Sequence, residues 1–286
     1  MVDVLVLNYN DAATTIQFVK SIFVFSSVRK ILVVDNHSTD ESLNCLRDIS
    51  NEKVEVVSTD RNGGYGYGNN YGIKYLHEKC SSKYILLANP DVIVDEKTVN
   101  EMLVFLKKNS DYAIVAPLMT NPKGVVQYNT AFKLPSLWRF LMSFEILSSR
   151  TFKPFYYKQL ENLPKPFCDV DALAGSLFMM DAEKMIRYGM FDENVFLYCE
   201  EQILGAKFRK AKQKIAMLTS EKYIHNHSVS ISKSYKKSFD KNVLLNKSKT
   251  YLLKTYYHAN PIVLVFAKFL VALNLVESFV IDFFRR

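Results

Sequence analysis

Residues 31–40 read ILVVDNHSTD, an apolar run that ends on the carboxylate Asp35 and passes into residues that favour the start of a helix. A short aliphatic run of this kind is typical of a buried strand, and Ser38, Thr39 and Asp40 are common helix N-caps. In sheets covered by helices, ligands bind outside the carboxyl ends of the strands. Asp35 could therefore accept hydrogen bonds from a nucleobase or ribose, although a turn and a helix cap explain the same residues.

The same alternation continues on both sides of this stretch. Strand-like runs cover residues 2–7, 54–57 and 84–87, and helix-like spacing covers residues 11–26, 40–49, 67–79 and 97–108. Such alternation predicts a parallel sheet with helices on both faces. Between residues 117 and 170, where six of the eight prolines lie, we expect irregular loops with aromatic packing that form part of an acceptor site.

The composition predicts a chain that folds around a core and leaves open which kind of partner it binds. The 286 residues are 49% hydrophobic, enough to bury a core, and carry a net charge of +8. A basic chain suits nucleic acid, an anionic membrane surface or a phosphorylated small molecule, but the lysines cluster late rather than around an aromatic platform, which disfavours nucleic acid. Four scattered cysteines and an N-terminus without a basic region predict reduced thiols and a cytoplasmic protein without a secretory signal.

A glycine-rich stretch, RNGGYGYGNN at residues 61–70, follows the third predicted strand. Glycines allow close backbone approach, and a helix N-terminus attracts anionic phosphate. The stretch is not the dinucleotide fingerprint, because Asn69 and Tyr71 stand where that motif needs glycine. The paired asparagines favour a binding loop over a plain flexible loop.

Asn89-Pro90-Asp91 directly follows the fourth predicted strand. A single Asp at a strand end can hold a divalent cation whose other ligands come mostly from a diphosphate. A proline-bearing turn capped by Asp91 is the alternative. His225, beyond the last strand-like run at residues 214–218, could bind the same cation or be structural.

Carboxylates cluster between Phe191 and Glu201, ending in the pair Glu200-Glu201. A partly buried carboxylate beside another has a raised pKa and can act as a general base. The alternative is that Glu200 and Glu201 are ordinary acidic residues in the first turn of a helix over residues 198–212, where acidic residues are common.

Taken in order, these motifs resemble those of the family 2 inverting nucleotide-sugar glycosyltransferases, particularly the rhamnosyltransferase-like branch that includes capsular polysaccharide enzymes. The matching segments, spread over residues 2–230, are Val34–Asp40, Asn62–Gly72, Asn89–Asp91, Gly175–Phe178, Phe191–Glu193, Phe196–Glu201 and His225. The resemblance implies a GT-A fold for residues 1–230, an α/β domain with a Rossmann-like, mostly parallel central sheet flanked by helices. A C-terminal helical extension follows.

The resemblance also implies roles for single residues. Asp35 would contact the base or ribose, Asp91 and His225 would bind Mg²⁺ or Mn²⁺, and Glu201 would be the catalytic base with Glu200 beside it. The residues expected at the nucleotide-sugar donor are Asn8, Asp35, Asn36, Asp40, Asn62, Gly63, Asn69, Asn70 and Asn89. Many relatives read E-D-x-D where this chain reads Glu200-Glu201-Gln202-Ile203, which leaves open which Glu takes the proton.

The implied activity is transfer of a sugar from a nucleotide-diphosphate sugar to a saccharide or undecaprenyl-linked acceptor in bacterial surface polysaccharide synthesis. The identity of the sugar is not implied. The alternative is a catalytically inactive sugar-nucleotide-binding scaffold of a polysaccharide assembly complex. The presence of both Asp91 and the Glu pair disfavours that scaffold.

Residues 231–286 are expected to form a basic linker and apolar C-terminal helices. Seven lysines lie between residues 231 and 258, and a helix over residues 262–284 would carry an apolar stripe of Val265, Phe269, Ala272, Val276, Phe279, Val280 and Phe283. Such a helix is long enough to span a bilayer, but Lys268, Glu277 and Asp282 favour an interfacial position on the cytoplasmic leaflet. Packing on the catalytic domain, or on a second copy to make a homodimer, is the alternative.

Overall fold

The N-terminal half alternates strands and helices as the sequence predicts. The computed structural model describes residues 1–144, 155–157, 159–226 and 238–284. Its first elements are β1 (Val2–Asn8), α1 (Ala12–Phe23), β2 (Val28–Asp35), α2 (Ser42–Arg47), β3 (Val54–Ser58), α3 (Tyr65–Cys80), β4 (Tyr84–Ala88), β5 (Val92–Ile93) and α4 (Glu96–Lys108). Helix α3 begins at Tyr65, earlier than expected, because Gly64 has φ +90° and turns the chain directly into it.

The second half is more irregular. Its elements are β6 (Tyr112–Thr120), η1 (Tyr128–Thr130), β7 (Ala131–Phe132), α5 (Leu137–Leu141), η2 (Leu160–Asn162), β8 (Phe167–Asp169), β9 (Ala172–Leu173), β10 (Leu177–Asp181), α7 (Ala182–Tyr188), α8 (Glu200–Lys210) and β11 (Lys214–His225). After β6, the described part of the proline-rich region holds only short elements, because prolines lack the N–H that extended ladders and helices need.

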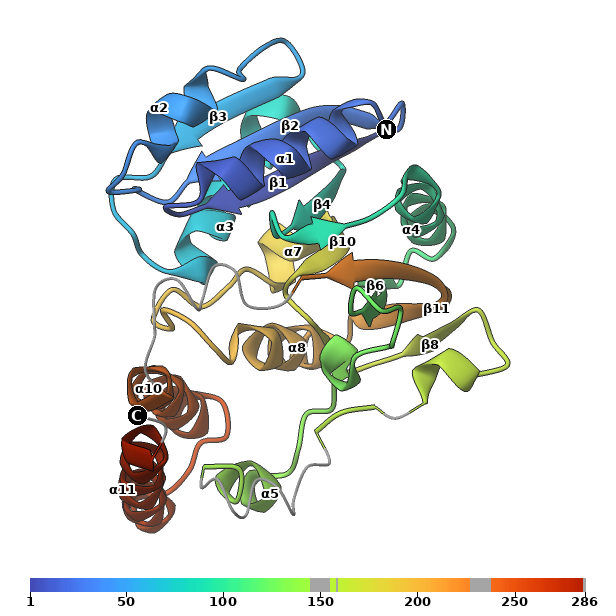
Figure 1. The fold of residues 1–286 in the computed structure, drawn as a ribbon. Helices are drawn as coiled ribbons and strands as arrows, with labels where there is room; N and C mark the ends of the chain where they lie inside the picture. Colours follow the sequence, from blue (N-terminus) through green and yellow to red (C-terminus); the bar gives the residue numbers. More distant parts are fainter. Residues whose placement is uncertain (145–154, 158, 227–237, 285–286) are drawn as a thin grey trace.

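Nine of the described strands form one sheet in the order β3-β2-β1-β4-β10-β6-β11-β5, with β8 paired to β11, while β7 and β9 form a separate two-stranded sheet. The pairs β3–β2, β2–β1, β1–β4 and β6–β11 are parallel. Strand β10 runs antiparallel between β4 and β6 and so joins the two parallel parts. The predicted fold class, a mostly parallel sheet flanked by helices, is confirmed (Figure 1).

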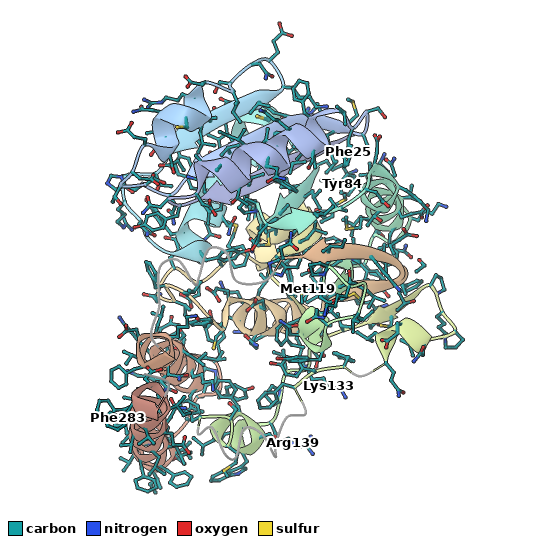
Figure 2. The ribbon with its side chains drawn as sticks, viewed as in Figure 1. Phe25, Tyr84, Met119, Lys133, Arg139 and Phe283 are labelled. Carbon is teal, nitrogen blue, oxygen red and sulfur yellow. The ribbon has the colours of Figure 1, made fainter. Side chains whose placement is uncertain are left out.

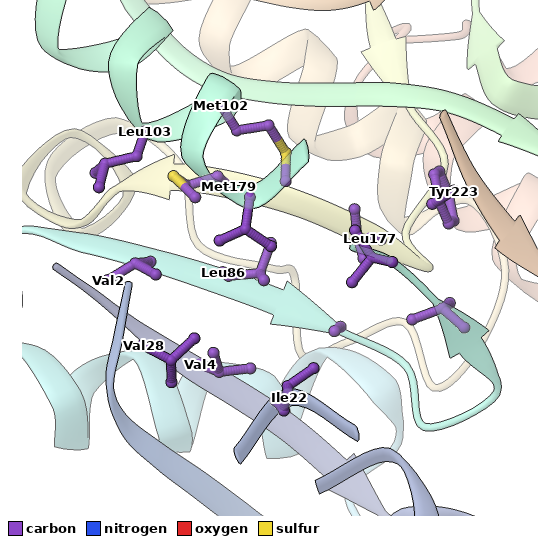
Figure 3. Packing of buried hydrophobic residues seen from close by; sticks show 14 of the residues in the cluster. Val2, Val4, Ile22, Val28, Leu86, Met102, Leu103, Leu177, Met179 and Tyr223 are labelled. Atoms are coloured by element: carbon purple, nitrogen blue, oxygen red, sulfur yellow. The ribbon is translucent and has the colours of Figure 1, made fainter. Parts of the chain in front are cut away.

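Both faces of the sheet are covered by apolar layers. On one face, side chains of β1, β4 and β10 meet α1 and α4, as Val4, Ile22 and Met102 illustrate (Figure 3). On the other face, α3, α7 and α8 pack through Ile73, Met185 and Phe208. Since the strands are buried on both sides, their near-continuous apolar sequences follow from the packing.

The register of the parallel strands gathers polar residues at one edge. Asn8 at the end of β1 pairs with Asp35 at the end of β2, and Asp35 pairs with Ser58 of β3. Val6 pairs with Ala88, the last residue of β4, so Asn89 leaves the sheet at the same edge. Parallel strands end together, so motifs far apart in sequence meet there.

The C-terminal residues form α10 (Ser238–Thr255) and α11 (Pro261–Phe284), which pack on each other near α5 (Figure 1). The described part of the expected basic linker is therefore largely the helix α10, while residues 231–237 lie outside the described residues. Leu252 and Leu253 of α10, Leu270 of α11 and Ile203 of α8 share one apolar cluster with α5. The extension is thus packed on the domain that carries the Glu pair.

Helix α11 packs inward through the apolar residues Val263, Ala267 and Leu270 and through polar residues further along, while its predicted apolar stripe faces outward. Asn274 and Ser278 are buried, and Asn274 Oδ1 accepts a hydrogen bond from Asn246 Nδ2 of α10 at 2.7 Å. All seven residues of the predicted apolar stripe are exposed, with Val265, Phe279 and Phe283 at 64–67%. Figure 2 shows side chains standing out along α11, with Phe283 of the stripe labelled. Packing on the domain therefore leaves the apolar stripe uncovered.

Candidate active site

The loop after β2 is held by the buried carboxylate of Asp35. Asp35 Oδ1 accepts hydrogen bonds from Asn8 Nδ2 at 2.8 Å and Ser38 Oγ at 2.5 Å, and Oδ2 accepts from the Ser38 N–H at 2.9 Å. Thr15 Oγ1 donates to Asn8 Oδ1 at 2.8 Å and so orients the Asn8 amide. Asp35 thus fixes the loop after β2, and its contact with a base or ribose stays a prediction.

Asp40 closes the same loop from its far end. Its Oδ1 accepts the Ser42 N–H at 2.9 Å at the start of α2. The hydrogen bonds with Ser42 lower the pKa of Asp40, so the carboxylate stays ionised. Asp40 thus holds the start of α2, and its expected place at the donor stays a prediction.

The glycine-rich loop packs between the Asp35 loop and the segment before the Glu pair. Asn36 Nδ2 donates to Asn62 Oδ1 at 3.1 Å and to Gly64 O at 3.0 Å, and Gly63 lies between these two residues. Gly64 has φ +90°, and a Cβ there would overlap the carbonyl oxygen of Phe196. Only glycine therefore allows this close approach of two backbone segments.

The paired asparagines of α3 face the protein interior. Asn69 Nδ2 donates to Tyr65 O at 2.9 Å. Asn70 Nδ2 donates to Phe191 O at 3.0 Å and to Glu193 Oε1 at 2.8 Å, and Asn70 Oδ1 accepts the Phe191 N–H at 2.9 Å. Asn70 therefore fastens the F-D-E segment to α3, while the predicted place of both residues beside a diphosphate stays a prediction.

Asp91 and His225 are far apart in the sequence and come together through the neighbouring strands β5 and β11. Strand β11 pairs with β5 so that His225 is opposite Val92, and the Asn226 N–H binds Asp91 O at 3.0 Å. His225 Nε2 lies 3.2 Å from Asp91 Oδ1, and their side chains are 11% and 9% exposed. The sequence predicted both as ligands of one cation, and the structure brings them together.

Glu201 lies against the strand-like segment that ends in Gly175. Its Oε1 accepts the Gly175 N–H at 3.3 Å, and Tyr65 OH donates to Gly175 O at 2.5 Å. Burial, with the nearby charges of Glu201 and Glu200, holds the pKa of Tyr65 well above its ordinary value. Tyr65 thus stays protonated and joins the glycine-rich loop to Glu201.

The two neighbouring carboxyl groups have different surroundings. Glu200 is 5% exposed, and its Oε1 has no hydrogen-bond partner among the described residues, whereas Glu201 is only half-buried. Burial raises the pKa of both groups, and the neighbouring charge of Glu201 raises that of Glu200 further. Raised pKa values in adjacent carboxyl groups are typical of sites that hold or move protons.

Gly175 and Ser176 join the Glu pair to the Asp91–His225 pair. The Asn89 N–H donates to Ser176 O at 2.8 Å, and Ser176 Oγ lies 2.7 Å from Tyr223 OH. His225 Nδ1 lies 3.3 Å from Met119 Sδ, which Ser176 Oγ also contacts at 3.6 Å. One continuous set of contacts thus runs from the Asp35 loop through Glu201 to His225.

Several residues of this network were not singled out from the sequence. Tyr65 and Gly175 stand inside recognised motifs, so those motifs could have pointed to them. Tyr251 and Tyr256 of α10 carry no such signal, yet their hydroxyls donate to Asp192 Oδ2 at 2.9 and 2.7 Å. Burial raises the pKa of Asp192, but hydrogen bonds from Tyr256, Asn194 and Tyr251 lower it by more. The net pKa is below its ordinary value, so Tyr251 and Tyr256 clamp an ionised carboxylate.

Residues 3–176 match the family described as glycosyl transferase family 2. Over 205 residues the chain is 26% identical to the low-salt glycan biosynthesis hexosyltransferase Agl10 of Haloferax volcanii, covering 71% of this chain and 61% of that protein. It is 27% identical over 205 residues to an N-acetylglucosaminyl-diphospho-decaprenol L-rhamnosyltransferase of Mycobacterium tuberculosis, covering 68% and 66%. The rhamnosyltransferase WbbL of Escherichia coli is 28% identical over 149 residues, covering 48% and 51%. The chain thus spans between half and two thirds of these relatives.

Solved structures share the fold at low sequence identity. A mannosyltransferase of Pyrobaculum calidifontis, in complex with GDP-Man and Mn²⁺, is 16% identical with a TM-score of 0.56, covering 95% of this chain and 74% of that one. GalNAc-T7 with UDP, GalNAc and Mn²⁺ is 14% identical with a TM-score of 0.60, covering 80% and 44%. At such identity the likeness establishes the GT-A fold alone.

Proposed function

The chain belongs to glycosyl transferase family 2, and we propose that it transfers a sugar from a nucleotide-diphosphate sugar to a saccharide acceptor with inversion at the anomeric carbon. The observation that carries this proposal is the contact network at the sheet edge. In that network Gly175 binds Glu201, and the adjacent Ser176 binds the Asn89 backbone, two residues before Asp91. The proposed proton acceptor and the proposed cation-binding pair therefore adjoin each other, as transfer from a diphosphate donor requires.

The donor would lie along the carboxyl edge of β1, β2 and β4. The nucleoside fits the loop that Asp35 and Asn36 hold in place, and the diphosphate fits the region between the start of α3 and Asp91. The relatives with nucleotide-bound structures support this placement through their common fold.

Asp91 and His225 suit a divalent cation. A carboxylate oxygen and an imidazole nitrogen 3.2 Å apart offer two ligand atoms, and no set of three or more His, Cys, Asp or Glu side chains that could hold a metal occurs within the described ranges. The donor diphosphate would have to supply further ligands, which is the usual arrangement for Mg²⁺ and related cations. We propose Mg²⁺ or Mn²⁺, which would stabilise the charge that develops on the departing diphosphate.

Glu201 is the proposed base. The acceptor hydroxyl oxygen bonds to the anomeric carbon, the hydroxyl proton passes to the Glu201 carboxylate, and the bond from that carbon to the diphosphate oxygen breaks. The nucleotide diphosphate leaves with the electron pair. Glu200 lies beside the base but is more deeply buried, so we propose that it does not meet the acceptor.

We further propose that the exposed stripe of α11 binds the inner face of the cell membrane, where a lipid-linked acceptor would lie. Among the described helices, α11 is long and apolar enough to cross a membrane by length and composition. Its inner side is committed to α10, however, and Lys268 on α11 and Lys247 and Lys254 on α10 are exposed. An amphipathic helix with nearby lysines suits an anionic lipid surface, and each lysine near that surface would add ~1 kcal/mol.

Donor hydrolysis tests the enzyme against the inactive scaffold. The purified chain, with Mn²⁺ or Mg²⁺, is incubated with UDP-, GDP- and dTDP-sugars, and release of nucleotide diphosphate is measured. We expect metal-dependent hydrolysis of at least one donor. Nucleotide binding without turnover of any donor, with or without saccharides, would favour the scaffold.

A further inference from the structure

A cavity of about 400 Å³ opens in the irregular region between η1 and η2. This volume lies in the range of small-molecule sites, ~300–1,000 Å³. The aromatic, amide and carboxylate side chains that line it are Gln127, Tyr128, Tyr156, Tyr157, Gln159 and Glu161. None of the residues proposed to bind donor or metal lines it.

Aromatic rings form the walls of this cavity. The rings of Tyr128 and Tyr156 meet edge to face, with centroids 4.9 Å apart, and Phe132 lies 5.4 Å behind Tyr156. Tyr128 is 67% exposed, so its ring is free to meet a ligand. A pyranose ring has an apolar C–H face that packs on an aromatic ring and a rim of hydroxyls that amides and carboxylates bind.

The charge of the lining narrows the class of ligand. Among the described residues that line the cavity there is one carboxylate, Glu161, and neither Lys nor Arg. Among these described residues a phosphate or an acidic sugar would meet no cation, and the described cation beside them, Lys133, places its Nζ over the Tyr157 ring, 5.1 Å from the centroid. The amides of Gln127 and Gln159 and the tyrosine hydroxyls suit neutral hydroxyl groups instead.

Backbone pairing joins the cavity wall to the proposed base. Thr130 of the cavity accepts the Ala174 N–H at 3.1 Å, and the next residue, Gly175, donates to Glu201 Oε1 at 3.3 Å. Phe132 of β7 pairs with Ala172 of β9 on one side and bridges to Tyr156 on the other. Burial, Tyr128 and the charge of Glu201 raise the pKa of Tyr156 to about 12, as expected for a ring near that carboxylate.

We infer that this cavity binds a neutral pyranose ring of the saccharide acceptor, stacked on Tyr128 and Tyr156, so that the acceptor hydroxyl reaches Glu201. The inference rests on the proposed transferase function. It assigns acceptor recognition to the region after β6, apart from the donor-binding edge of the sheet.

Saturation-transfer NMR with a panel of neutral methyl hexopyranosides tests the inference without donor or turnover. We expect signal transfer to ring protons of at least one glycoside in the wild-type chain, and about tenfold weaker binding in Tyr128→Ala. Phe23→Ala, an exposed aromatic on α1, is the matched control and should bind as the wild type does. Melting temperature confirms that each variant folds.

The possible outcomes separate the cavity from the enzyme. Loss of glycoside contact in Tyr128→Ala, with metal-dependent donor hydrolysis unchanged, supports the acceptor subsite. Absence of contact with every glycoside, or equal contact in Tyr128→Ala and the wild type, overturns it. A wild-type chain that binds glycosides but hydrolyses no donor contradicts the proposed transferase and leaves a saccharide-binding cavity.

Discussion

Glu201→Gln tests the proposed base with the smallest change of shape. The Gln side chain keeps an Oε1 that can accept the Gly175 N–H, which Glu201 binds at 3.3 Å. It removes the negative charge and the capacity to take a proton. Because Asp35, Asp91 and His225 are unchanged, we expect nucleotide and metal affinity to stay at the wild-type level.

The rate of transfer should fall by ~10²–10⁴-fold, the usual effect of losing a general base, which corresponds to ~3–5 kcal/mol of barrier. Glu200 should not replace the lost base, because it is only 5% exposed and burial raises its pKa.

The pH profile provides a second reading of the same variant. Burial raises the pKa of Glu201 above its ordinary value of 4.5, and a base acts only when ionised. The wild-type kcat/KM should therefore rise with pH through a value above 4.5 and level off at higher pH, and Glu201→Gln should lose this limb.

The assay is the initial rate of nucleotide diphosphate release with Mn²⁺, from pH 4.5 to 9, with nucleotide affinity measured by calorimetry. Glu200→Gln is the matched control. If Glu201→Gln retains more than a tenth of the rate while Glu200→Gln loses its rate, the roles of the two residues are exchanged. If neither variant is impaired, the base lies elsewhere and the reasoning is refuted.

Four further predictions follow from the geometry. Asp91→Ala should abolish Mn²⁺-dependent nucleotide binding in calorimetry without lowering the melting temperature, and retained metal-dependent binding would contradict the metal site. Gly64→Ala should destabilise the fold by ~2–4 kcal/mol in denaturant unfolding, because a Cβ meets a backbone carbonyl at positive φ, and an unchanged midpoint would be inconsistent with that contact. Tyr256→Phe should cost ~1–2 kcal/mol of stability and lower kcat, since it removes a 2.7 Å hydrogen bond to a carboxylate before the Glu pair; stability equal to the wild type would show that the clamp is not needed. Phe279→Asp, on the exposed face of α11, should release the chain from anionic vesicles in sedimentation while Lys79→Asp on α3 should not, and vesicle binding unchanged by Phe279→Asp would contradict membrane binding by that face.

Local patterns in the sequence were enough to predict the framework of this protein. Aliphatic runs of four to seven residues alternate with helical spacing, and the first strands end on or directly before polar residues, such as Asp35 at the end of β2 and Asn89 after β4. Parallel strands must end at one edge, so the position of these residues in the chain already implied that they meet. The family resemblance likewise rested on the sequence alone, because it depended on the order of the motifs along the chain.

Contacts between distant segments were decided only by the tertiary structure. The sequence could not distinguish Glu200 from Glu201, because their difference in burial arises from packing of α8 against α5 and α10. It could not show that Tyr251 and Tyr256 clamp Asp192, since hydroxyl partners some sixty residues away leave no local pattern. For α11 the helical period predicted the apolar stripe, but not which side faces the protein. In the structure the inward side carries the apolar Val263, Ala267 and Leu270 and also Asn274, which pairs with the buried amide of Asn246. Burial is a property of the assembled chain, so the outward position of the apolar stripe appears only in the tertiary structure.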